Sequence, residues 1–216
     1  MKKIVILVAA CFLAIAANAQ IVSSSSNTYI KTGDSGFSAL WLSYMPTTFK
    51  TSYNGSSHSE SGYNTFALGY THAAPMSAAP ILIEYGAFAE YTTKTEKSHG
   101  ASSTVSLIGA KVPVSAMYAF PLSDNVTLYP YAGVNARFYV IGKETYKYEG
   151  DSESYNIFDD EEGDGIRRFA LGYQIGVKAK VSGFFVGLGY EDMITSLDPD
   201  YTAKLNMINI SVGIPF

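Results

Sequence analysis

The nine residues at the end of the chain, "INISVGIPF" (208–216), alternate apolar side chains with polar or small ones without interruption. The apolar positions are Ile208, Ile210, Val212, Ile214 and Phe216. A period of two is the period of a β-strand, because successive side chains of a strand point to opposite faces of the sheet. One face of this strand therefore meets an apolar environment, which is either a protein core or lipid.

The start of the chain predicts export. Two lysines precede an apolar run over residues 4–17, and the run ends in small residues. This pattern is typical of a secretory signal peptide over residues 1–19, cleaved between Ala19 and Gln20. The single cysteine, Cys11, follows a short stretch that resembles a lipoprotein cleavage site, but the apolar run continues beyond it, which favours a cysteine inside the signal peptide. The mature chain then has no cysteine for a disulfide.

Composition excludes some classes of function and favours one class of structure. The chain has 15 basic and 19 acidic residues and a formal net charge of -4, so it lacks the basic excess of a nucleic-acid-binding protein. The 19 glycines, 17 tyrosines and 12 phenylalanines favour strands and turns. After the signal peptide, no apolar run approaches the roughly 18 residues of a membrane-spanning helix.

Residues 20–35 lack periodicity and predict a flexible lead-in, whereas residues 36–216 predict one β domain. Eight segments in that domain have a period of two: 37–45, 62–72, 80–92, 103–119, 125–141, 167–181, 184–192 and 203–216. Most are as long as the roughly 9 to 11 residues that cross a bilayer as a tilted strand. The segments therefore suit an all-β, eight-stranded antiparallel up-and-down transmembrane barrel.

The connections between these segments alternate in length. Long connections cover 46–61, 93–102, 142–166 and 193–202, and short ones cover 73–79, 120–124 and 182–183. In an up-and-down barrel this alternation places all long loops on one rim and the turns, with both termini, on the other. A soluble β-sandwich has no reason to sort its connections in this way.

Charged residues within the segments fall on the less apolar of the two faces. They are Glu84, Glu90, Lys111, Arg137, Arg168, Lys178 and Glu191. Because eight strands enclose only enough room for side chains, we expect these residues to form an ion-paired plug in the lumen. An open aqueous pore is the less favoured alternative, since an unpaired buried charge costs several kcal/mol.

Two features of the strands stay open at this stage. In the first segment, Leu40, Leu42 and Tyr44 compete with Phe37, Ala39 and Trp41 for the lipid-facing side. Pro113 and Pro130 each remove a ladder hydrogen bond from a barrel that has no edge strand. We expect them at nearly the same height, with a β-bulge beside them near the turn end.

The sequence at this point resembles the small outer-membrane β-barrel proteins of Gram-negative bacteria, of the OmpA/OmpX type and the outer membrane protein beta-barrel domain family. The resemblance covers residues 36–216 and rests on the signal peptide with sorted loops, on "YAFPLSDNVTLYPYAGVNARFY" (118–139), and on the alternating C-terminal strand ending in Phe216. It implies an outer-membrane location with periplasmic termini and extracellular loops. It also implies that the outer-membrane assembly machinery recognises the C-terminal strand, and that lipopolysaccharide surrounds the barrel.

Little in the sequence points to chemistry. The histidines His58, His72 and His99 lack a serine two positions later on the same face, as a lipid A deacylase would need, so we predict no enzyme. The acidic stretch "DDEEGDG" (159–165) lacks the spacing of an EF-hand, and we predict no metal or cofactor. The favoured function is a structural or surface-interaction role. A transporter or narrow channel for small, hydrophobic solutes is the alternative, and a secreted lipocalin-like barrel is a more distant one.

Overall fold

The computed structural model describes residues 36–76, 80–98, 100–149, 151–158, 165–198 and 200–216. The described chain is built from strands: β1 (Phe37–Tyr53), β2 (Ser56–Pro75), β3 (Ile81–Ser98), β4 (Ala101–Tyr118), β5 (Phe120–Ser123), β6 (Val126–Tyr148), β7 (Asp151–Asn156), β8 (Phe169–Val181), β9 (Phe184–Met193) and β10 (Thr202–Pro215). The predicted signal peptide, its cleavage site between Ala19 and Gln20, and the lead-in lie outside the described residues. Within the described part, no helix is long and apolar enough to cross a membrane.

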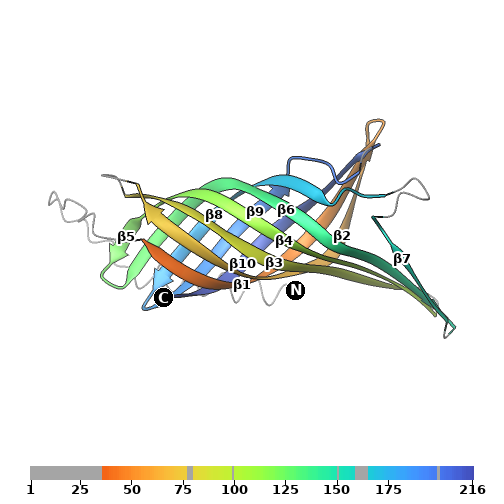
Figure 1. Cartoon of the computed structure of the whole chain (residues 1–216), viewed down its shortest axis with the longest axis horizontal. Helices are drawn as coiled ribbons and strands as arrows, with labels where there is room; N and C mark the ends of the chain where they lie inside the picture. The colour runs from red at the N-terminus through yellow and green to blue at the C-terminus, as the bar shows by residue number, and fades with distance from the viewer. Residues whose placement is uncertain (1–35, 77–79, 99, 150, 159–164, 199) are drawn as a thin grey trace.

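Eight of the strands close into an antiparallel ring in the order β1, β2, β3, β4, β6, β8, β9 and β10 (Figure 1). The ring closes where β1 pairs with β10, from Ala39 opposite Pro215 to Ser52 opposite Thr202. Each ring strand contains or overlaps one of the eight segments predicted from the period of two. The predicted eight-stranded up-and-down barrel is therefore confirmed.

The structure settles which face of β1 points outward. Trp41 is 2% exposed and lies inside the barrel, whereas Leu40 and Leu42 are 52% and 56% exposed on the outside. Gly213 lies opposite Trp41 on β10 and leaves room for the indole, because a Cβ atom there would lie 2.7 Å from the ring. The outer wall of the barrel is accordingly a belt of exposed apolar side chains on every ring strand.

Two of the predicted long loops, 46–61 and 93–102, are wrong, because the strands continue through them. The predicted loop 142–166 is wrong in part, because it contains the end of β6 and the strand β7. Strands β1 and β2 run on to a two-residue turn at Asn54 and Gly55, whose φ angles of 45° and 80° fit a type I′ turn. Strands β3 and β4 similarly extend to Ser98 and Ala101. The dipeptide Asn-Gly is a strong hairpin signal in sequence, and it identifies the first of these turns.

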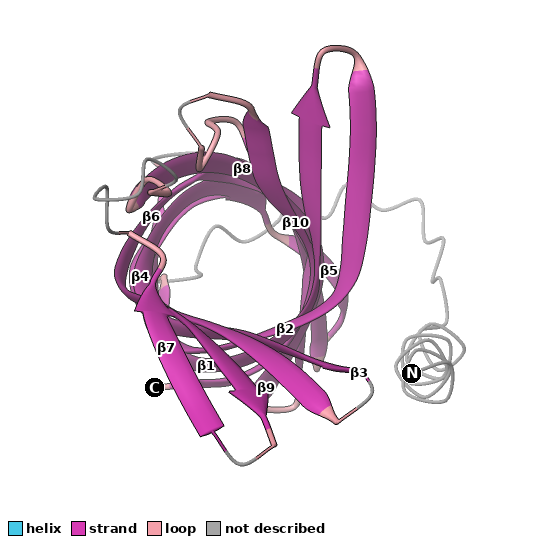
Figure 2. Cartoon of the chain, turned by 90° about the vertical axis from the view of Figure 1, so that its right-hand side faces the viewer, coloured by secondary structure: helices cyan, strands magenta, loops and turns pink. Residues whose placement is uncertain are grey.

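The extended strands form two sheets beyond the ring. The first sheet contains the ends of β10, β1 and β2, and the second contains those of β3, β4, β6 and the short strand β7. They diverge at the end of the barrel opposite the C-terminus (Figure 1). Seen along the barrel, the extended hairpins reach past the outline of the ring (Figure 2).

The bulge predicted beside Pro113 and Pro130 is also wrong. Pro113 lies opposite Asn135, so the two prolines are not at one height. The pairing of β3 with β4 is interrupted near Pro113 without a change of register. The register shift between β4 and β6 instead falls at Ile108 and Gly109, where β6 has one extra residue. A local gap in the ladder is thus sufficient to accommodate Pro113.

Candidate functional site

Among the residues that the structure describes, six of the buried charged side chains lie in the ring of the barrel and come from five strands. Each is between 1% and 8% exposed: Glu84, Glu90, Lys111, Arg137, Lys178 and Glu191. They come from β3, β4, β6, β8 and β9, whose alternation turns these positions inward. Three carboxylates and three cations make the set formally neutral.

Four of these residues form a closed cluster of ion pairs. The Lys111 ammonium lies 3.0 Å from Glu191 Oε1 and 3.4 Å from Glu90 Oε1. The Arg137 guanidinium lies 3.0 Å from Glu90 Oε2 and also pairs with Glu191 Oε2. Each cation therefore contacts both carboxylates, which compensates the loss of hydration on all four groups.

Neutral polar groups complete this four-residue cluster. Asn135 Oδ1 accepts a hydrogen bond of 2.7 Å from Arg137 Nη1, and Asn209 Nδ2 donates one of 2.7 Å to Glu191 Oε1. Arg137 Nη2 also contacts the sulfur of Met207 at 3.5 Å. The guanidinium and the Glu191 carboxylate are thus held from several strands at once.

The remaining two charged residues, Lys178 and Glu84, form an ion pair nearer the end of the barrel that carries the short turns and the C-terminus, which we call the turn end. Lys178 Nζ donates to both oxygens of Glu84 at 2.6 Å, and Thr71 Oγ1 donates to Glu84 Oε1 at 2.9 Å. The ammonium also lies 4.4 Å from the ring of Trp41 and 5.1 Å from the ring of Tyr131. Cation–π contacts add to the stabilisation of this desolvated cation.

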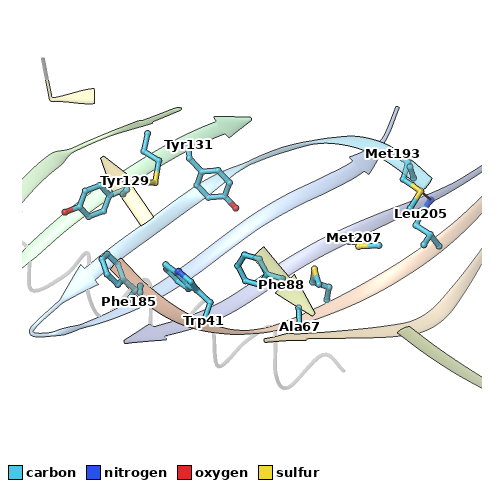
Figure 3. Close-up of a cluster of buried hydrophobic side chains, with 14 of the residues drawn as sticks. Trp41, Ala67, Phe88, Tyr129, Tyr131, Phe185, Met193, Leu205 and Met207 are labelled. Atoms are coloured by element: carbon cyan, nitrogen blue, oxygen red, sulfur yellow. Dashed lines mark hydrogen bonds between the residues drawn. The ribbon is translucent and has the colours of Figure 1, made fainter. Parts of the chain in front are cut away.

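Buried hydrophobic side chains lie along the lumen from one end of the barrel to the other (Figure 3). Tyr129 and Phe185 pack toward the turn end, with ring centroids 6.0 Å apart. Met193, Leu205 and Met207 pack toward the hairpin end and are almost fully buried. Between them, the cavity lined by Trp41, Phe88, Lys111, Tyr131, Lys178, Glu191 and their neighbours measures about 30 Å³. That space suits individual water molecules and no larger solute.

Arg168 does not join the cluster, which corrects its predicted place in the lumen. It is exposed, its Nη1 donates to the carbonyl of Val140 at 2.8 Å, and its guanidinium stacks 4.3 Å from the ring of Phe158. The physical reason is that β8 begins only at Phe169, so Arg168 precedes the stretch whose alternation is fixed by the wall.

Several lumen residues were absent from the prediction. Trp41, Thr71, Asn135, Gln174 and Asn209 all take part in hydrogen bonds of the lumen. Each lies on the inward parity of its strand, so the alternation could have identified them. The prediction considered only ionisable groups and so omitted them.

The predicted C-terminal assembly residues all lie on the outward parity of β10. Ile208, Val212, Ile214 and Phe216 are exposed and Ile210 is half-buried. Phe216 is 73% exposed, and its ring packs 5.8 Å from that of Tyr70. This places the aromatic terminus at the turn end of the outer wall.

One histidine lies beside a serine in the structure, although the serine is not two positions after it in the sequence. Ser38 Oγ lies 3.0 Å from His72 Nδ1 on the outer wall. Within the described residues, no carboxylate is hydrogen-bonded to His72, and no group of three or more His, Cys, Asp or Glu side chains is placed to hold a metal ion. His58 is exposed, while His99 and the acidic residues 159–164 lie outside the described part.

Several solved structures of bacterial proteins are similar to this chain. Ail, the attachment invasion locus protein of Yersinia pestis, is 17% identical, with 84% of this chain and 99% of Ail covered and a TM-score of 0.45. Neisserial surface protein A is 14% identical, with 82% and 99% covered and a TM-score of 0.43. The outer membrane enzyme PagL is 14% identical, with 82% and 99% covered and a TM-score of 0.44. A comparison with curated protein sequences gave no significant match.

The sequence itself carries the family assignment. The family model described as "outer membrane protein beta-barrel domain" matches residues 7–216, nearly the whole chain. The match agrees with the closed ring of eight strands, its apolar outer belt and its polar interior. The chain belongs to the outer membrane protein beta-barrel domain family.

Proposed function

We propose that the protein is an integral outer-membrane barrel with a closed lumen, whose function is carried out by the surface of its extended hairpins. The observation that carries this proposal is that six buried charges pair with one another, four in one cluster and two in a separate ion pair, with buried apolar side chains toward both ends of the barrel. A solute crossing the lumen would have to separate these ion pairs. Breaking one buried pair costs about 3 to 5 kcal/mol, so a constitutive pathway is disfavoured.

The glycines of the wall do not provide the space that a solute pathway would need. A Cβ atom placed on Gly133 would lie 2.1 Å from the Val114 carbonyl oxygen. One placed on Gly213 would lie 2.7 Å from the ring of Trp41. The space beside these glycines is filled by backbone and by Trp41. We therefore favour the surface role over the transporter or narrow channel, and over an enzyme.

We further infer the partners of the barrel and its orientation in the membrane. Outer-membrane lipid and lipopolysaccharide surround the belt, the turn end with the C-terminus faces the periplasm, and the hairpin sheets extend outside the cell. The C-terminal residues Ile208, Ile210, Val212, Ile214 and Phe216 supply the signal read by the assembly machinery. Their outward, accessible placement on β10 supports this role.

Conductance across a planar bilayer tests the closed lumen. We compare the refolded protein with Lys111→Ala/Arg137→Ala, which removes both cations of the four-residue cluster. Lys97→Ala/Lys147→Ala is the matched control, because it removes the same charge from the exposed hairpins. We expect no openings in the parent or the control and openings in the lumen variant. Stable openings in the parent would refute the proposal and make the lumen a pathway.

A further inference from the structure

The outward faces of the two hairpin sheets carry one type of charge. In the first sheet, the rows of directly paired residues are Asn206–Thr48–Ser61, Lys204–Lys50–Ser59 and Thr202–Ser52–Ser57. Directly paired residues share a face of the sheet, so each row lies on one side. These rows contain lysines, hydroxyls and an amide, and no carboxylate.

The second sheet repeats the pattern on its outward face. Its rows are Thr93–Ser106–Lys143–Asn156, Thr95–Thr104–Thr145–Ser154 and Lys97–Ser102–Lys147–Ser152. The carboxylates of the same strands all lie on the reverse face: Glu60, Glu96, Glu144, Asp151 and Glu153. We call the rows of both sheets together the outward lysine face. The neighbouring outward carboxylate, Asp192 on β9, accepts hydrogen bonds from Asn206 and Tyr173.

The outward lysine face begins directly above the apolar belt. The row Tyr91–Ile108–Ile141 is exposed and belongs to the belt, and the next row in the same strands contains Lys143. One row corresponds to roughly 7 Å along a strand, which a lysine side chain can bridge. The hairpins reach past the outline of the ring (Figure 2), so their ends lie outside the wall of the barrel.

One pair of lysines on this face would be stabilised by a bound anion. Lys50 and Lys204 lie directly opposite each other on neighbouring strands, an arrangement that like charges destabilise. Within the described residues, neither lysine is ion-paired with a carboxylate, and neither is Lys143. An anionic oxygen placed between the two ammonium groups would convert the repulsion into two favourable contacts.

We propose that the outward lysine face binds the phosphate groups of lipid headgroups in the outer leaflet, with Lys50, Lys204 and Lys143 as the principal contacts. The serine and threonine hydroxyls of the same rows supply further hydrogen-bond donors. The proposal rests on the outer-membrane function proposed above. It names a lipid phosphate rather than a soluble polyanion, because the face adjoins the apolar belt.

Lysine acetylation in nanodiscs, read by mass spectrometry for each site, tests the proposal. The refolded protein is placed in phosphatidylcholine discs that contain either bisphosphorylated lipid A or dephosphorylated lipid A. We expect Lys50, Lys143 and Lys204 to react about fivefold more slowly with the phosphorylated lipid, which corresponds to ~1 kcal/mol per lysine. Lys180, beside the Ser182–Gly183 turn at the other end of the barrel, should react equally in both.

A second measurement separates charge from folding. The number of phosphorylated lipid A molecules retained after detergent extraction should fall in Lys50→Gln/Lys204→Gln and recover in Lys50→Arg/Lys204→Arg. Equal protection by dephosphorylated lipid A would overturn the proposal. So would protection in discs without lipid A on addition of soluble polyphosphate, which would identify a soluble ligand. Either failure would leave the closed lumen, tested by conductance, unaffected.

Discussion

The four-residue cluster in the lumen should respond to substitution as a coupled unit. Arg137→Met removes a cation that contacts Glu90 and Glu191, and leaves Lys111 to balance two carboxylates. Glu191→Gln removes a carboxylate that contacts both cations. All four groups are almost fully buried, so each substitution leaves an uncompensated charge in a region of low dielectric constant. We expect each to lower the free energy of unfolding by about 3 to 5 kcal/mol.

The double variant Arg137→Met/Glu191→Gln should be less unstable than the sum of the single variants. It restores neutrality, because Lys111 and Glu90 then remain as a pair whose charged atoms lie 3.4 Å apart. Residues in one ion-pair network typically show coupling energies of about 0.5 to 3 kcal/mol. We expect a value at the upper end of this range, since both residues contact the same partners.

Urea unfolding from lipid vesicles measures these differences, and the protein contains a suitable probe. Trp41 is the single tryptophan of the chain and lies in the lumen, so its fluorescence reports exposure of the interior. Val134→Ala on the outer wall serves as a control for substitution outside the lumen. This prediction would be refuted if each single variant lowered the free energy of unfolding by less than about 1 kcal/mol, or if the effects of the two single variants were additive. Either result would mean that water solvates these charges and that the lumen is not sealed.

Three further predictions concern other parts of the barrel. Lys94 lowers the pKa of Glu96 by hydrogen bonding and Coulomb attraction, so this contact stabilises the hairpins at neutral pH. The stabilisation is lost as the pH falls below 4.5, the ordinary pKa of a glutamate side chain. Hydrogen exchange of the hairpin amides should show that loss, and the pH dependence should disappear in Glu96→Gln. Gly86→Ala should lower stability to urea, because its Cβ would lie 2.1 Å from the carbonyl oxygen of Tyr70; unchanged stability would mean that the wall yields there. Deleting Phe216 should reduce assembly in cells but not refolding in detergent, and equal loss in both would assign the residue a purely structural role.

The membrane-spanning part of the fold was predictable because lipid imposes a simple rule on each strand. Lipid accepts apolar side chains, so the outward parity is apolar and the inward parity can be polar, as in β6 and β8. The same rule predicted that Lys111, Arg137 and Glu191 point inward. It could not predict which carboxylate meets which cation, because every pair except Lys111–Glu90 joins strands that do not adjoin in the ring. Those contacts depend on barrel curvature and side-chain length.

The rule of apolar outward and polar inward side chains does not hold in the hairpins beyond the ring, and the loops predicted there are strands in the structure. The hairpin strands have polar residues on both faces, so residues 46–61 and 93–102 lack a hydrophobic period of two. Local turn chemistry was the remaining signal, and Asn54-Gly55 carried it. Arg168 was misplaced for a related reason, since parity has meaning only inside a strand and β8 begins one residue later. The ambiguous parity of β1 was decided by tertiary space, because Gly213 on the neighbouring strand leaves room for the Trp41 indole.

Charge in the hairpin sheets is sorted by face, and this sorting bears on where the protein acts. The chain has more acidic than basic residues, yet the outward rows of both sheets contain lysines and no carboxylate. Hairpins that met only water on both faces would be expected to mix the two signs, since neither face would be distinguished from the other. A face that meets a phosphate-rich surface has a reason to exclude carboxylates, because each would repel the surface at short range. The reverse faces, which carry Glu60, Glu144 and Glu153, are free of that constraint, and there Glu60 pairs with Lys94 and Glu144 accepts a hydrogen bond from Ser103.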